Sequence, residues 1–164
     1  MRLVHPGQLC QFGELDPDGY LRITDRKKDL IVTSGGKKAS PQELEKLLRA
    51  IPLVGQAVVV GERRNYLCAL LTLEPEAARR FGREHGLDET SLAVMGTLPA
   101  VRQVLQRGID EVNARLARWE TIKRFEVLPA ELSVEGGELT PTLKVKRAVV
   151  GTKYASTIER LYAE

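Results

Sequence analysis

Cysteine, histidine and aromatic residues are scarce in this sequence of 164 residues. The two cysteines, Cys10 and Cys68, do not have the spacing of metal ligands, and His5 and His85 are isolated from each other. We therefore predict reduced thiols and no metal site. Aromatic residues make up only 5% of the chain, so we expect a core built mainly from Leu, Val, Ile and Ala.

Long apolar runs and a strong excess of one charge are also lacking. No apolar stretch approaches the roughly 20 residues that a membrane-spanning helix needs. The first ten residues, MRLVHPGQLC, lack the apolar centre of a signal peptide. The net charge of +3 suits anionic ligands but is too small for a dedicated nucleic-acid binder. We therefore expect a cytoplasmic protein that does not bind nucleic acid.

The hydrophobic pattern that is present predicts an α+β domain. Two nearly continuous apolar runs, 55–62 and 66–74, are expected to be strands joined by the turn RRN, in a sheet that is covered on both faces. Further strands are expected in YLRIT (20–24), DLIVT (29–33) and IKRFEVLP (122–129). The fold class that follows is a small mixed or antiparallel sheet flanked by helices.

The clearest predicted helix begins after Ser40. Ser40 is a good N-cap, Pro41 is suited to the first helical position, and Glu43 completes a capping box. Pro52 is expected to stop the helix. Its apolar face is expected to consist of Leu44, Leu47, Leu48 and Ile51.

Three more helices are expected further along the chain. One spans about 74–84, and the last follows LTPTLKVKR, with Val150, Tyr154, Ile158 and Leu161 on one face. The longest of the three has an apolar stripe made of Val101, Leu105, Ile109, Val112, Leu116 and Trp119.

The segment ITDRKKDLIVTSGGKKASP (23–41) allows two interpretations. Charges between two strand-like runs are typical of a solvated hairpin, and Gly-Gly is typical of another turn. Backbone N–H groups of a glycine loop can instead form an anion-binding nest, which Lys37 and Lys38 would flank. Arg26 offers a planar fork that suits phosphate or ribose oxygens.

The segment LTPTLKVKR (139–147) is similarly open. Lys144, Lys146 and Arg147 could be the solvated first turn of the last helix. Cations at a helix N-terminus oppose its dipole, however, so stability alone is a poor reason to place them there. A lysine on this loop could instead reach a phosphate as a mobile charge.

Taken together, the two segments resemble a known family. GELDPDGYLRITDRKKDLIVTSGGKKASPQELE is similar to the start of the C-terminal domain of adenylate-forming acyl-CoA synthetases, and LTPTLKVKR is similar to the loop that carries their adenylation lysine. The wording of both motifs is closest to the long-chain fatty acyl-CoA synthetase branch. The resemblance runs from about residue 13 to the end of the chain.

The resemblance implies roles for particular residues. Lys144 matches the catalytic lysine that reaches the α-phosphate and the substrate carboxylate during adenylation. Lys28 matches the hinge about which the domain rotates, and Arg26 matches the arginine that contacts the ribose. Ser34, Gly35 and Gly36 match the loop that faces coenzyme A, where Gly35 lets the pantetheine arm pass.

The resemblance also implies an organisation. Residues 1–24 would be a lead-in and the remnant of a junction with a missing N-terminal adenylation domain, and residues 25–164 would be the mobile C-terminal domain. ATP with Mg²⁺, coenzyme A and a fatty acid would be bound mainly by the missing domain, so we expect the chain to be inactive alone. Peripheral membrane association of the full-length enzyme is left open. One departure is Gln11, which stands where the family has a ribose-binding aspartate, unless that residue is absent here.

Two other classes of function remain as alternatives. The chain could be a freestanding interaction or regulatory module derived from a split synthetase. It could also be a small basic nucleic-acid binder, but such a protein needs base-stacking aromatic residues on an exposed strand face, and the few aromatics lie mostly at core-like positions.

Overall fold

The computed structural model describes residues 11–15, 21–26, 30–86 and 91–163. A three-stranded sheet forms its centre, with strands β5 (Val54–Val60), β6 (Leu67–Leu73) and β7 (Ile122–Val127) in that order. β5 pairs with β6 antiparallel, and β7 pairs with β6 parallel. The sheet is therefore mixed, which is one of the two arrangements that the sequence allows.

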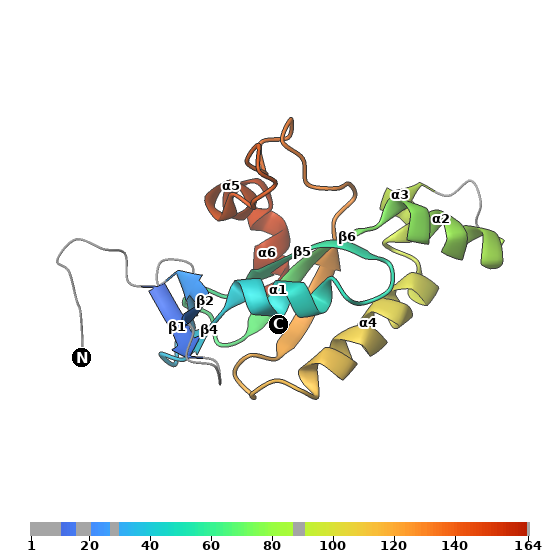
Figure 1. Ribbon diagram of the computed structural model, residues 1–164. Helices are drawn as coiled ribbons and strands as arrows, with labels where there is room; N and C mark the ends of the chain where they lie inside the picture. The colour runs from blue at the N-terminus through green and yellow to red at the C-terminus, as the bar shows by residue number, and fades with distance from the viewer. Residues whose placement is uncertain (1–10, 16–20, 27–29, 87–90, 164) are drawn as a thin grey trace, which may run out of the picture.

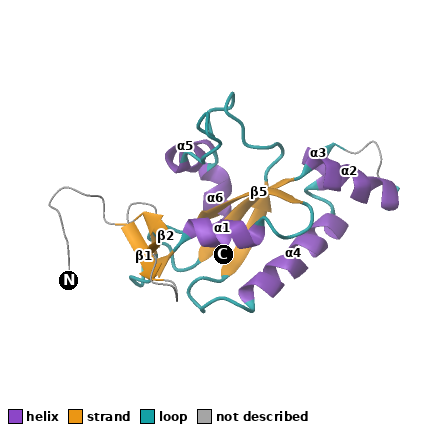
Figure 2. Cartoon of the chain, in the orientation of Figure 1, coloured by secondary structure: helices purple, strands orange, loops and turns teal. Residues whose placement is uncertain are grey.

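Helices cover both faces of this sheet (Figures 1 and 2). Helices α1 (Pro41–Leu48), α2 (Pro75–Glu84), α3 (Leu92–Met95) and α4 (Pro99–Asn113) share one hydrophobic cluster, and α5 (Arg147–Lys153) and α6 (Ala155–Tyr162) share the other. All seven residues of β6 are buried, and apart from Thr72 their side chains alternate between the two clusters. This explains why the β6 run is almost entirely apolar. Within the described residues, no helix is long and apolar enough to cross a bilayer.

Helix α1 begins as predicted and ends earlier. The Ser40 hydroxyl accepts a hydrogen bond from the N–H of Glu43, and Pro41 is the first helical residue. The helix ends at Leu48, four residues before Pro52, in a turn that buries Ile51. Ile51 packs directly on Gly108 of α4, where an added Cβ would lie 2.3 Å from a methyl group of Ile51. The absence of a side chain at Gly108 therefore sets how closely α4 approaches this turn.

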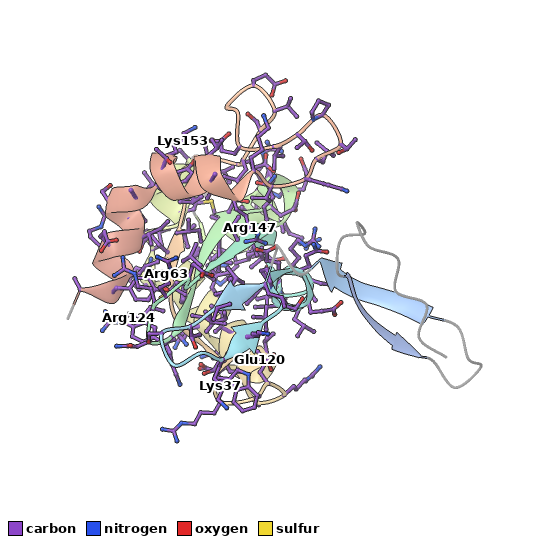
Figure 3. All side chains as sticks on the ribbon, turned by 90° about the vertical axis from the view of Figure 1, so that its left-hand side faces the viewer. Lys37, Arg63, Glu120, Arg124, Arg147 and Lys153 are labelled. Atoms are coloured by element: carbon purple, nitrogen blue, oxygen red, sulfur yellow. The ribbon has the colours of Figure 1, made fainter. Side chains whose placement is uncertain are left out.

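Two small hairpins precede the central sheet. Strand β1 (Gln11–Leu15) pairs with β2 (Leu21–Arg26), and β3 (Ile31–Val32) pairs with β4 (Lys38–Ala39). The two predicted strands on either side of the charged run therefore belong to different sheets, and the solvated-hairpin interpretation of that run is wrong. Figure 3 shows the β1–β2 hairpin standing apart from the rest of the domain.

The longest predicted helix ends before Trp119. Helix α4 stops at Asn113, whose side-chain amide binds both backbone groups of Ile122 at 2.8 and 2.9 Å. This double hydrogen bond fixes the chain to the first residue of β7 and turns it away from the helix axis. Leu116 still packs against the core, but Trp119 lies in the loop with 46% of its surface exposed.

The last predicted helix is two helices. The backbone of Tyr154, at φ −107° and ψ 21°, leaves the helical region and separates α5 from α6. The predicted apolar face is nevertheless correct, because Val150 and Leu161 are buried in one cluster with Tyr154 and Ile158 packed against it.

Candidate functional site

Lys144 lies in a tight turn between β7 and α5. The N–H of Thr140 donates to the carbonyl of Lys144 at 2.8 Å, and the N–H of Lys144 donates to the Thr140 hydroxyl at 3.0 Å. An antiparallel bridge between Leu139 and Val145 closes the base of the turn. The Lys144 side chain is exposed. The structure therefore presents a solvent-facing ammonium group on a backbone of defined shape.

The residue before this lysine has an unfavourable backbone conformation. Leu143 has φ of 59°, in the left-handed region that residues with a Cβ seldom adopt, and 71% of its surface is exposed. Such a conformation costs about 1–3 kcal/mol and is commonly found at functional sites. The N–H of Leu143 donates to the carbonyl of Thr140 at 2.8 Å, which closes the turn.

Glu138 anchors the turn to helix α5. Its carboxylate, in a residue only 2% exposed, pairs with Lys153 and accepts hydrogen bonds from the Tyr154 hydroxyl and the Ser133 N–H, both at 3.4 Å. Its carbonyl accepts from the N–H of Lys146 at 2.7 Å. The hydrogen bond from Lys153 holds the pKa of Glu138 below its ordinary value, so this anchor stays charged at neutral pH.

The glycine loop is the turn of the β3–β4 hairpin. The N–H of Thr33 donates to the carbonyl of Lys37, and the N–H of Gly36 donates to the carbonyl of Thr33, both at 2.9 Å. Gly36 has φ of 73°, which a residue without Cβ adopts at no cost. Gly35 is exposed at the tip, and a Cβ built there would meet no heavy atom within 4 Å. The tip therefore leaves open space in front of Gly35.

The turn between β5 and β6 fixes the glycine loop in place. The N–H of Ser34 donates to the carbonyl of Arg64 at 2.9 Å, and its hydroxyl donates to Asn65 at 2.6 Å. The carbonyl of Val32 accepts a hydrogen bond from the N–H of Arg63 at 2.8 Å, and the N–H of Val32 donates to the carboxylate of Glu62 at 3.0 Å. The amides of Ser34, Gly36 and Lys37 all donate to groups within the protein, so these three amides are not free to form an anion-binding nest.

The structure gives a partial view of the predicted nucleotide and hinge residues. Arg26 is the last residue of β2 and is the register partner of Gln11 in β1. The arginine predicted to contact the ribose and the residue in place of the family's aspartate therefore sit opposite each other across one ladder. Lys28 lies outside the described residues, in the short link through which the chain passes from the β1–β2 sheet to β3.

Two features of this region have no counterpart in the sequence interpretation. The ammonium of Lys37 lies 5.1 Å from the ring centre of Trp119, which places the one tryptophan of the chain beside the glycine loop. A groove of about 500 Å³ runs between Leu30, the outer strand β5 and the helices α5 and α6. Its lining is mainly apolar, with Arg147 among the polar groups. Neither feature had a sequence signal, because each joins residues far apart in the chain.

Comparisons with known proteins agree with the fold and with the family resemblance. The family described as AMP-binding enzyme C-terminal domain matches residues 28–164. The long-chain-fatty-acid–CoA ligase FadD15 of Mycobacterium tuberculosis is 42% identical over 151 residues, which cover 92% of this chain and 25% of that protein. The long-chain-fatty-acid–CoA ligase ACSBG1 of Rattus norvegicus is 35% identical, over 98% of this chain and 24% of that protein.

Solved structures support the same assignment. The adenylation domain of the carboxylate reductase of Mycobacterium chelonae superposes with a TM-score of 0.69 at 28% identity, covering 92% of this chain and 22% of that one. The chain thus spans about a quarter of the length of the curated relatives it matches. Over residues 28–164, the chain belongs to the family of AMP-binding enzyme C-terminal domains.

Proposed function

We propose that this chain acts as the mobile C-terminal domain of a long-chain fatty acid–CoA ligase. The observation that carries the proposal is Lys144, an exposed ammonium on a braced turn in the motif LTPTLKVKR. The relatives of which this chain covers about a quarter are ligases of that kind. In this proposal, residues 25–164 form the mobile domain, residues 1–24 are the junction, and an N-terminal adenylation domain is the partner.

The proposed reaction has two half-reactions. In the first, a fatty acid carboxylate attacks the α-phosphorus of ATP and expels pyrophosphate, which gives the acyl-adenylate. Lys144 would stabilise the negative charge that gathers on the phosphoryl oxygens and hold the incoming carboxylate, an electrostatic role that needs no proton transfer. In the second, the thiol of coenzyme A loses its proton and attacks the acyl carbonyl, and AMP leaves.

The glycine loop and the hinge would serve the second half-reaction. Ser34, Gly35 and Gly36 would face coenzyme A, and the open space at Gly35 fits the passage of a narrow pantetheine arm. Rotation about Lys28 would exchange the Lys144 turn for the glycine loop at the reaction centre, and Arg26 would contact the ribose. Hinges of this kind are a few loop residues that absorb large changes in φ and ψ.

The metal and the location follow from the same proposal. The described residues hold no group of three or more His, Cys, Asp or Glu side chains that could bind a metal, so Mg²⁺ would arrive with ATP and be held by the adenylation domain. We place the enzyme in the cytoplasm, where ATP and coenzyme A are available and a free thiol such as the buried Cys68 stays reduced. Peripheral contact with a membrane would belong to the full-length enzyme.

Ligase activity should require an adenylation domain. We expect the purified chain to form no acyl-CoA from a long-chain fatty acid, ATP, Mg²⁺ and coenzyme A. A chimera in which this chain replaces the matched C-terminal quarter of FadD15 should form it. The control is FadD15 lacking that quarter. Acyl-CoA formation by the isolated chain, or a chimera no more active than this control, would contradict the proposal.

A further inference from the structure

A partly buried ion pair, Glu45–Arg147, connects the segment of the glycine loop to the segment of the Lys144 turn, away from the tips of both loops. Glu45 lies in helix α1, which follows the glycine loop, and Arg147 is the first residue of α5, three residues after Lys144. The Arg147 guanidinium donates to the Glu45 carboxylate at 2.7 Å. Figure 3 shows Arg147 between α5 and the strands.

The pair is also built into the outer strand of the central sheet. The Glu45 carboxylate accepts a hydrogen bond from the N–H of Val59 at 2.9 Å, and Arg147 donates to the carbonyl of Val59 at 3.2 Å. Val59 belongs to β5, which among the described strands pairs only with β6. The two side chains thus make the hydrogen bonds that a neighbouring strand would make with Val59. Helices α1 and α5 and strand β5 are connected at this residue.

Stability alone is a weak reason for such an arrangement. Only 10% of the Glu45 side chain and 32% of the Arg147 side chain are exposed. Burial raises the pKa of Glu45 above its ordinary value, and the attraction of Arg147 offsets only part of that effect. Buried ion pairs commonly add little net stability, because removing two charges from water costs about as much as their attraction returns. What the pair supplies is a fixed distance between α1 and α5.

We propose that the Glu45–Arg147 pair is a strut that holds the glycine loop and the Lys144 turn as one rigid unit. Arg147 would be a positioning residue for Lys144, since it fixes the point from which that side chain extends. The consequence for catalysis rests on the proposed function, in which the two loops alternate at one reaction centre. If the distance between the glycine loop and the Lys144 turn is constant, one rotation of the domain brings one of them to the reaction centre and takes the other away.

Hydrogen exchange on the purified 164-residue chain tests the strut without using activity. In Arg147→Met and in Glu45→Gln, we expect faster exchange of the protected amides of both loops, by about tenfold or more relative to the amides of β6. The reporter amides are Gly36, Thr140, Leu143 and Lys144. The matched control is Arg102→Met, which removes a similarly exposed arginine that pairs with Glu126 at 3.7 Å and links α4 to β7. Loss of protection in all elements equally, or in one loop only, would overturn the proposal.

Adenylation in the FadD15 chimera provides the second readout. We expect Arg147→Met to lower kcat for acyl-adenylate formation about tenfold or more while KM for ATP stays near the parent value, because the lysine is misplaced and the nucleotide site is intact. Arg147→Lys should recover part of the loss. If Lys144→Ala is harmless in the same chimera, the proposed function is wrong; if only Lys144→Ala is harmful, the strut is wrong.

Discussion

Lys144→Ala in the FadD15 chimera should lower the rate of acyl-adenylate formation by about 10²–10³, the usual cost of removing one group that stabilises transition-state charge. The thioester step, started from preformed acyl-adenylate and coenzyme A, should stay near the rate of the parent. The reason is that the Lys144 turn would be away from the reaction centre in that step. Pyrophosphate exchange measures the first half-reaction and acyl-CoA release measures the second.

Lys146→Ala is the matched control for this prediction. Lys146 is also an exposed lysine, two residues further along, and its N–H is held by the carbonyl of Glu138 whatever its side chain. Both half-reactions should remain near the parent rate in this variant. Equal loss of both half-reactions in Lys144→Ala would count against the assigned role, as would equal effects of the two substitutions.

Lys28→Pro should impair the thioester step more than adenylation, by on the order of 10²-fold if the glycine loop is held even slightly out of place. Proline fixes φ near −65° and restricts the residue before it, so a rotation that passes through this position is blocked. Position 28 is a reasonable place for such a rotation, because it lies in the sequence between β2 and β3, which belong to separate sheets.

Lys28→Ala distinguishes a role of the backbone rotation at position 28 from a role of the side-chain charge. Alanine keeps the freedom of the backbone and removes the ammonium group, so both half-reactions should stay close to those of the parent. Rapid mixing of coenzyme A with preformed acyl-adenylate gives the rate of the second step directly. If alanine is as harmful as proline, the side chain matters rather than the rotation. A thioester step unchanged by proline would remove Lys28 as the hinge.

The sequence predicts the central part of the fold because local pattern and burial agree there. The nearly continuous apolar run of β6 predicts a strand covered on both faces, and Ser40 and Pro41 predict the start of α1. Trp119 shows where periodicity fails. It continues the apolar stripe of α4, but the side-chain amide of Asn113 ends the helix by bonding to Ile122, and this competition depends on a strand nine residues away.

The candidate site was predictable only as far as its motifs extend. Lys144 and the glycine loop lie in recognisable segments, so their presence could be read from the chain. The residues that hold these segments in place could not be predicted from the sequence. Glu138, Glu45 and the turn at 62–65 are ordinary polar residues, and only the fold brings them to their hydrogen-bond partners. The contact between the Lys37 ammonium and the Trp119 ring could not be predicted either, because the two residues are far apart in the sequence.

Labelling with an ATP analogue that carries a pyridoxal aldehyde on its phosphate chain tests the central claim most directly. The aldehyde forms a Schiff base with an amine that lies beside the phosphates, and borohydride fixes it for mass spectrometry. In the FadD15 chimera, we predict labelling of Lys144 that ATP prevents, with Lys146 unlabelled as the internal control. Labelling of both lysines alike, without protection by ATP, would contradict the claim that this domain delivers Lys144 to the nucleotide.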